Sequence, residues 1–489
     1  MASVTRWLFA DQLGPHFLDD EEQRVLLIES RRVFARRRFH RAKAHLVLSA
    51  LRHRAAELAD RASFVQAGTY AEALNGRVEV SHPTSYRALK FVQGRDVDLL
   101  PARGFVTTMA DFAAWVDGRS GRLLMEDFYR DARRRHDVLM AGTDPVGGRW
   151  NLDADNREAP PRKQRTLGVT PPWSPQEDEI DEQVRCDLDA WQEAGEVSFV
   201  GRDGPRLFAA TRTEALAALG HFVATRLATF GPYEDAMLAA DTAMSHSLLS
   251  APLNLGLLDP LECVRAAEQA YADGIAPLQS VEGFIRQIMG WRDYVWHLYW
   301  QQGPAYRGRN ALEAHNPVPD WLWDLDADAV QARCLRGVLA QVREQGWTHH
   351  IPRLMVLGSW ALQRGIDPAE LTEWFHLSFV DGYDWVMVPN VVGMSQYGDG
   401  GVMATKPYTS GGAYIDRMSD FCGPCVYDPK KRVGPDACPY TAGYWAFLDR
   451  NRSRLDGNRR MGRAIGGLDR LVDLDELRAQ ESTRGTSAP

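Results

Sequence analysis

Short apolar runs alternate with longer polar or helical stretches in the first 125 residues of the chain. The runs at residues 7–10, 25–28, 64–67, 78–80 and 105–108 predict strands. Residues 31–60 are basic, carry apolar residues at helical spacing and predict one long helix with a solvated arginine face. This alternation predicts an α/β N-terminal domain over residues 1–135, built on a parallel sheet. No G-x-G-x-x-G follows the first run, which argues against a dinucleotide-binding half of the Rossmann type.

The pattern changes after about residue 135. Residues 136–180 are rich in proline, glycine and polar residues and predict a linker between domains. From residue 181 to 475 apolar residues recur at helical spacing, which predicts a large all-α domain. Its clearest helical segments are residues 215–230, 259–275, 280–300, 329–346 and 368–387. Residues 476–489 become charged and then small and polar, and we expect a disordered tail.

The composition is that of an ordinary globular protein. The chain has 489 residues, which is too long for one core and predicts two or three domains. There is no run long enough for a membrane span and no secretion signal at the start, so we expect a cytoplasmic protein, most simply a monomer. The net charge of −8 argues against a general nucleic-acid coat, but it allows a local basic patch.

Four cysteines in the last third of the chain form the sharpest chemical pattern. Cys422 and Cys425 make a C-x-x-C motif, Cys438 follows closely and Cys334 lies far upstream. Four thiolates can hold zinc or a [4Fe–4S] cluster, and the spacing leaves both open. Buried cysteines without a metal are the less favoured alternative. The remaining two, Cys186 and Cys263, lie in helical patterns and are expected in the core.

Several motifs in a fixed order point to one family. They are DPVGGRWNLDADNR (144–157), SHSLLS (245–250), EGFIRQIMGWRDY (282–294), HHIPR (349–353), DGYDWVMVPNVVGMSQYGDGG (381–401), TKPYTSGGAYIDRMSDFC (405–422) and ACPYTAGYWAFLDRN (437–451). Together with the four cysteines they resemble the iron–sulfur bacterial cryptochromes and photolyases, also called prokaryotic (6-4) photolyases. The resemblance covers residues 125–465 well and the N-terminal domain loosely. It implies a Rossmann-like α/β domain of photolyase type, followed by an all-α domain that binds FAD.

The resemblance also implies cofactors and a partner. Family members bind FAD, a [4Fe–4S] cluster held here by Cys334, Cys422, Cys425 and Cys438, and usually a 6,7-dimethyl-8-ribityllumazine antenna. They repair (6-4) photoproducts in UV-damaged DNA with light, or they act as light sensors. The residues implied at the FAD site are Ser245, His246, Ser247, Leu248, Leu249, Ser250, Arg286, Trp291, Arg353, Asp381, Met387 and Asn390. From the residues alone, plain N-capping of a helix is the favoured interpretation of the 245–250 stretch, and the alternative for Arg286 is a helix face with one salt bridge.

Two adjacent histidines carry the implied repair chemistry. Opening the lesion needs proton transfer coupled to an electron, and histidine donates protons near neutral pH. By resemblance His350 is the acid and His349 supports it, although adjacent histidines are more often surface or metal-binding residues. Tyr408 would contact the lesion. Trp374 would pass electrons to the flavin, with core packing as the alternative.

The sequence departs from its relatives at three places. Phe375 follows Trp374 where relatives can carry a redox-active tyrosine, and Met387 stands where a polar residue is common. After Glu29, a basic segment replaces the residues that hold the antenna, although Asp11 and Gln12 remain. The last of these departures weakens the expectation of an antenna, whereas Phe375 bears on the electron path and Met387 on the flavin radical.

Three functions remain open at this point. The first is a light-driven DNA lyase, which needs the histidine pair, Tyr408 and a basic rim. The second is a blue-light photoreceptor on the same fold without repair. The third is an iron–sulfur nucleic-acid-binding module without flavin. The presence of the histidines and Tyr408 favours the first.

Overall fold

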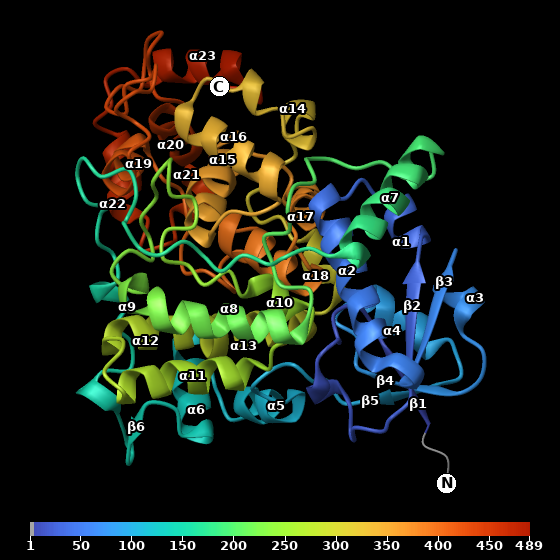
Figure 1. The fold of residues 1–489 in the computed structure, drawn as a ribbon. Helices are drawn as coiled ribbons and strands as arrows, with labels where there is room; N and C mark the ends of the chain where they lie inside the picture. Colours follow the sequence, from blue (N-terminus) through green and yellow to red (C-terminus); the bar gives the residue numbers. More distant parts are fainter. Residues whose placement is uncertain (1–3) are drawn as a thin grey trace.

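The computed structural model describes residues 4–489 and begins with a five-stranded parallel sheet (Figure 1). The strand order is β3-β2-β1-β4-β5, with Trp7 of β1 in register with Leu26 of β2. The strands are β1 Thr5–Leu8, β2 Val25–Ser30, β3 Ala62–Ala67, β4 Val78–Ser81 and β5 Val97–Leu100. The helices of this part are α1 Arg32–Ala35, α2 Arg41–Leu58, α3 Tyr70–Ala73 and α4 Tyr86–Gln93. The predicted α/β fold with a parallel sheet is confirmed.

One predicted strand is wrong. Residues 105–108 do not join the sheet, because the backbone N–H groups of Val106 and Thr107 donate to the buried carboxylate of Asp293 at 3.0 and 2.6 Å. Phe105 stacks on Trp296 with ring centroids 4.0 Å apart. The segment therefore joins the sheet domain to the helices. The fifth strand is β5, whose apolar pattern is interrupted by aspartate.

The predicted basic helix is divided in two at residues 36–40. His40 is extended and caps α2 by accepting from the N–H of Ala42, while its own backbone N–H donates to the carbonyl of Leu377. Four of the five arginines at residues 31–38 are exposed, as predicted, and the segment also makes ion pairs. Arg31 pairs with Glu196 at 2.6 Å and Arg37 with Glu373 at 3.1 Å, so the segment ties the two parts of the chain together.

Residues 109–302 supply the first group of helices. They are α5 Met109–Asp117, α6 Met125–His136, α7 Glu179–Glu193, α8 Arg212–Thr225, α9 Leu227–Phe230, α10 Ser250–Asn254, α11 Pro260–Ala272, α12 Leu278–Ile285 and α13 Asp293–Gln302. The short strands β6 Met140–Ala141 and β7 Asp144–Pro145 pair before a long irregular stretch that ends at α7. Helix α7 packs on α2 beside the sheet (Figure 1). Cys186 on α7 is exposed, so the prediction that it lies in the core is wrong, whereas Cys263 is buried.

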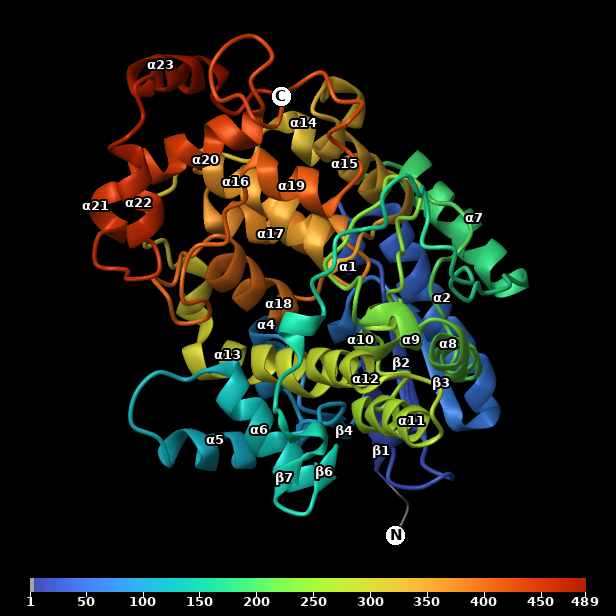
Figure 2. The same ribbon diagram turned by 90° about the vertical axis from the view of Figure 1, so that its left-hand side faces the viewer.

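The rest of the chain forms a second helical layer. Its members are α14 Asp320–Trp323, α15 Arg333–Gln345, α16 Ser359–Arg364, α17 Pro368–Ser378, α18 Asp384–Met387, α19 Gly412–Met418, α20 Pro439–Arg450, α21 Arg452–Leu455, α22 Gly462–Leu468 and α23 Leu474–Arg484. Figure 2 shows this layer above the one that contains α5, α6, α11, α12 and α13. None of the helices described has the length and apolarity that crossing a membrane requires.

The end of the chain is ordered, contrary to the expected disordered tail. Leu477 of α23 is fully buried, and Glu481 pairs with the buried Arg364 at 2.6 Å. The carbonyl of Pro489 accepts hydrogen bonds from the backbone N–H groups of Gln331 and Ala332. A buried leucine and a buried ion pair hold the segment in place. The polar composition of the segment, from which disorder was predicted, does not reveal either of them.

Candidate functional site

A cavity of about 1140 Å³ lies between the two helical layers. Small-molecule pockets usually measure about 300–1,000 Å³, so this cavity has room for a large ligand and part of a second one. The predicted site residues that line it are His246, Ser247, Leu248, Leu249, Ser250, Arg286, Trp291, His349, His350, Arg353, Asp381, Met387, Asn390 and Tyr408. Two predicted residues, Ser245 and Trp374, do not line it. The structure thus brings together predicted site residues that are up to 162 positions apart, from His246 to Tyr408.

Three helices that face the cavity each contain a π-helical segment. These are η5 Arg286–Arg292, η8 Pro352–Gly358 and η9 Val388–Ser395, and residues 4–489 contain no others. A π-turn inserts one extra residue into a helix and changes which side chains face inward. Here the three turns direct Arg286, Arg353 and Asn390 to the same space.

Arg353 and Asp381 form a hydrogen-bonded ion pair in the cavity wall. The guanidinium donates to both carboxylate oxygens, at 2.9 and 3.0 Å, and its Nε donates to the carbonyl of Thr348. The hydroxyl of Ser250 donates to the same carboxylate at 2.7 Å. This pairing fixes the position of a positive group beside the cavity, as the resemblance implied.

The 245–250 stretch is a strained loop that leads into the short helix α10. Leu248 has φ 57° and Met244 φ 47°, the left-handed conformation that is unfavourable for side chains with a Cβ. Ser245 is buried behind the wall with its hydroxyl 2.9 Å from that of Thr229. No side chain caps α10, so the N-cap reading of this stretch is wrong.

Acidic residues that the sequence reading missed also line the cavity. Arg286 is buried and faces the carboxylates of Glu282, Asp153 and Glu234 at 3.3, 3.4 and 3.7 Å. Burial raises the pKa of Glu234 to about 7, although the charge of Arg286 lowers it. Glu234 belongs to a short non-periodic segment between α9 and α10, and no spacing rule singles it out.

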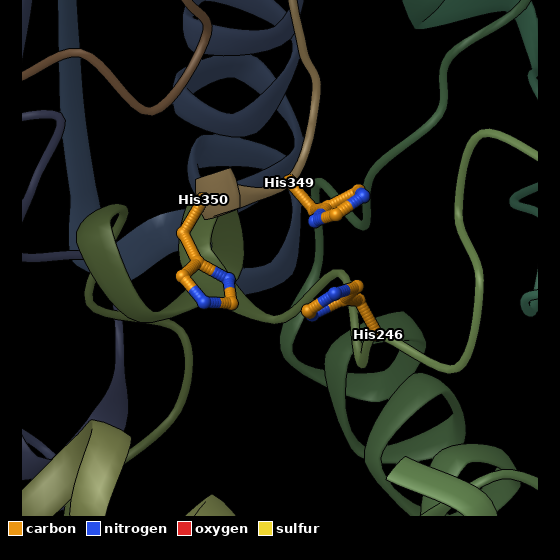
Figure 3. Close-up of side chains that lie close together, drawn as sticks. All are labelled: His246, His349 and His350. Carbon is orange, nitrogen blue, oxygen red and sulfur yellow. The ribbon is translucent and has the colours of Figure 1, made fainter. Parts of the chain in front are cut away.

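Three histidines meet at one wall of the cavity (Figure 3). The rings of His246 and His349 stack with centroids 4.3 Å apart, and the ring of His350 lies 5.4 Å from His246. Burial lowers the pKa of His246 and of His349 well below the usual value, so both are neutral at pH 7. His350 is the exposed member, and its Nε2 lies 3.5 Å from the carboxylate of Asp235.

Of the other predicted residues, two line the cavity and one lies behind its wall. Tyr408 lines the cavity beside Lys406, and burial raises the pKa of its hydroxyl. Met387 lines it as a buried apolar group. Trp374 is fully buried behind Phe375, with its ring centroid 4.8 Å from that of Phe375 and its Nε1 donating to the carbonyl of Leu322.

All four predicted cysteines line a second, smaller cavity. Cys334 lies near the start of α15, Cys422 and Cys425 lie in the loop after α19, and Cys438 immediately precedes α20. The other wall residues include Phe421, Tyr427 and Tyr440 but no carboxylate or histidine. A purely sulfur donor set in an apolar wall suits zinc or an iron–sulfur cluster and excludes hard oxygen-seeking ions.

The electrostatics of the thiols fit a metal centre. Burial raises the pKa of Cys334 well above its usual value, and the other three cysteines raise it further. Burial likewise raises the pKa of Cys422 to about 12. Burial raises the pKa of Cys438 as well, while the backbone N–H groups of Thr441 and Tyr440 lower it by smaller amounts. Four neighbouring thiolates need the compensating positive charge that a bound metal supplies.

Comparison with known proteins agrees with this arrangement. Residues 6–196 match the family described as deoxyribodipyrimidine photo-lyase-related protein. The chain is 38% identical over 503 residues to a (6-4) photolyase of Agrobacterium fabrum, and the match covers 97% of each chain.

Two solved structures are similar in fold at low identity. One is a class III photolyase from Agrobacterium tumefaciens, with a TM-score of 0.56 and 15% identity over 95% of this chain and 92% of that one. The other is a Synechocystis cryptochrome, with a TM-score of 0.52 and 14% identity over 80% of this chain and 82% of that one.

Proposed function

Because the chain belongs to the family of photolyase-related proteins, we propose that it is a DNA photolyase that repairs the (6-4) pyrimidine–pyrimidone photoproduct with light. The observation that carries this proposal is the cavity itself. It combines a fixed Arg353–Asp381 pair, an exposed histidine beside Asp235, and Tyr408 with Lys406 on one rim. The full-length relative named (6-4) photolyase supports repair over light sensing.

The residues of the cavity fit FAD. Two guanidinium nitrogens of Arg286, Nε and Nη2, form ion pairs with Glu282 and Glu234 at 3.3 and 3.7 Å but make no hydrogen bond, and the left-handed loop at Leu248 lies in the same wall. Buried donors without a hydrogen bond are costly, and a polar group of a bound ligand would satisfy them. We therefore assign the 246–250 loop, Arg286, Trp291, Arg353, Asp381, Met387 and Asn390 to flavin binding. Reduced FAD supplies the light-driven electron when it is bound.

His350 is the proposed proton donor. Its ring is the accessible one of the three histidines, and its Nε2 lies 3.5 Å from the carboxylate of Asp235. His349 is neutral and packed, so it orients the wall and does not supply the proton. Protonation of the lesion hydroxyl by His350 makes it a better leaving group for return to the neighbouring base. Tyr408 contacts the lesion, and Lys406 and the exposed Arg417 contact the phosphates.

Trp374 is the proposed electron donor for reduction of the flavin. Phe375 lies between it and the cavity, and the hydrogen bond to Leu322 fixes its orientation. Trp321 lies on the same short helix as Leu322 and packs edge-on to Trp360 at 4.9 Å, which offers a continuation toward the surface.

A [4Fe–4S] cluster is the proposed occupant of the cysteine cavity. The all-sulfur donor set fits it, and the family resemblance favours iron over zinc. The cluster would join α15 to the loop between α19 and α20, so its binding energy becomes folding energy. Iron and sulfide analysis of the protein should give about four of each per chain, and one zinc would refute the assignment.

The chain provides only half of an antenna site. Asp11 Oδ1 and Gln12 Oε1 are buried without partners, as a ligand site requires. The arginines of the neighbouring basic segment are instead paired with Glu196 and Glu373. We therefore propose FAD and the cluster as the bound groups, and no lumazine. Mass spectrometry of an acid extract that contains a ribityllumazine would contradict this.

Blue-light illumination of the reduced protein with an oligonucleotide that carries one (6-4) photoproduct tests the function. Chromatography should show the intact dipyrimidine returning with time in light and not in darkness. A cyclobutane dimer in the same oligonucleotide serves as the matched substrate control. Lesions that persist while the flavin is photoreduced normally would refute repair and favour the photoreceptor.

A further inference from the structure

One ring nitrogen from each of His246, His349 and His350 lies within 4.8 Å of the other two (Figure 3). The first histidine comes from the loop before α10, and the other two come from the segment that enters η8. The three rings therefore converge from separate parts of the chain. Figure 3 shows the rings of His246 and His349 face to face, with the ring of His350 beside them at a steep angle.

Two of these rings have nitrogens without any partner in the protein. His246 Nε2 and His349 Nδ1 are both buried and form no hydrogen bond. An unpaired buried polar atom costs about 1–3 kcal/mol, so this pair of atoms indicates a missing ligand.

We propose that His246, His349 and His350 bind a borderline-soft divalent metal ion of the zinc class. Zinc–nitrogen bonds are about 2.0–2.1 Å long, so two of them span at most about 4.2 Å. The nitrogens already lie within 4.8 Å of one another, and rotation of the stacked rings of His246 and His349 about their side-chain bonds would direct their in-plane lone pairs at one ion. The carboxylate of Asp235, 3.5 Å from His350 Nε2, adds negative charge beside the ion. Magnesium and calcium do not fit, because they prefer oxygen ligands.

Metal binding at this place has a consequence for the proposed repair reaction. A metal ion occupies the imidazole lone pair that a proton would otherwise take, so His350 cannot hold a transferable proton while it is a ligand. Zinc is thus expected to inhibit repair reversibly. This consequence depends on the proposed function, whereas the metal site itself does not.

Equilibrium dialysis of the flavin- and cluster-loaded protein against buffered free zinc tests the site without light or DNA. The wild type should bind one zinc per chain in addition to its iron. Separate His246→Asn and His350→Asn substitutions should each weaken binding by at least about tenfold, the lower bound for losing even an outer partner of a metal ligand. The exposed His315, which does not line the cavity, provides the matched control, and His315→Asn should bind like the wild type.

Equal zinc binding by all four proteins, or none by the wild type, would overturn the site. Competition by magnesium at the same concentration would also overturn it, because it would indicate oxygen ligands. His350 is half exposed, so its variant gives a result even if His246→Asn does not fold. Repair measured with and without zinc tests the second step. Zinc that binds but leaves the repair rate unchanged would refute the coupling to His350.

Discussion

Lys43 links the sheet domain to the turn that carries the flavin-site aspartate. Lys43 lies on α2, and the amino group of its side chain donates to the carbonyls of His376 and Gly382 at 2.7 and 2.8 Å. The side chain is buried, and burial lowers its pKa to about 7, while Asp381 raises it by a smaller amount. An unfolded lysine has a pKa near 10.4. Unfolding between pH 7 and 10 therefore takes up a proton.

The sign and size of the effect follow from this difference. The unfolded chain binds more protons over this range, so the free energy of unfolding rises with pH by up to about 1.4 kcal/mol per pH unit. The stabilisation is complete above about pH 10 and is lost as the pH falls toward 7. Between pH 7 and 9 Lys43 alone contributes up to about 2.5 kcal/mol, or about 5–10 °C in the thermal midpoint of a domain of this size.

Thermal unfolding followed by circular dichroism at pH 7 and pH 9 measures this contribution. In Lys43→Met the rise of the midpoint with pH should shrink by about 5 °C or more relative to the wild type. Lys90 is exposed on α4, so Lys90→Met should keep the wild-type rise and provides the control for other groups that titrate in this range. Equal rises in all three proteins would refute the lowered pKa of Lys43.

Four further outcomes are expected. Asp381→Asn should destabilise the protein by about 3 kcal/mol and release flavin, because it leaves the Arg353 charge unpaired. Ser250→Ala removes only one hydrogen bond to the same carboxylate and should cost about 1 kcal/mol. Equal thermal midpoints for the two variants would contradict this difference. His350→Asn should lower the repair rate about 100-fold without changing flavin photoreduction, and a rate within threefold of the wild type would contradict the acid role. Cys425→Ala should yield insoluble or cluster-free protein, and soluble protein with full iron content would count against a structural cluster. Deletion of residues 474–489 should lower the thermal midpoint, since Leu477 is fully buried; an unchanged midpoint would mean that the tail contributes no packing.

The fold could be predicted from the sequence where local patterns are strong. Four of the five strands follow apolar runs, and the helical half follows the 3.6-residue period. The failures come from contacts between distant segments. Residues 105–108 look like a strand, but Asp293, nearly 190 positions away, takes up their backbone N–H groups. The tail looks disordered, yet Arg364 pairs with Glu481. Both partners, Asp293 and Arg364, lie far away in the sequence, so a local pattern cannot reveal these contacts.

The candidate site could be predicted from motifs but not from physics alone. The residues of the 245–250 loop, the histidine pair and Asp381 were found by resemblance, and the structure brings all of them except Ser245 into one cavity. Glu234 and Asp235 were not predicted as site residues, because two acidic residues in a short loop usually lie in solvent. Here Glu234 is buried beside Arg286, and only the packing of η5 against that loop makes this visible.

The positions of the π-helical segments explain why the periodicity could not locate the cavity. Segments 280–300 and 368–387 have an uninterrupted helical pattern, yet η5 interrupts the first and η9 directly follows the second. An extra residue in a helix costs hydrogen-bond quality, and it persists only where the surroundings compensate for it. All three π-segments within residues 4–489 face one cavity, and the strained Leu248 lies in the same wall. Such a concentration is expected when a large ligand supplies the compensation, so removal of bound flavin should loosen these segments first in hydrogen exchange.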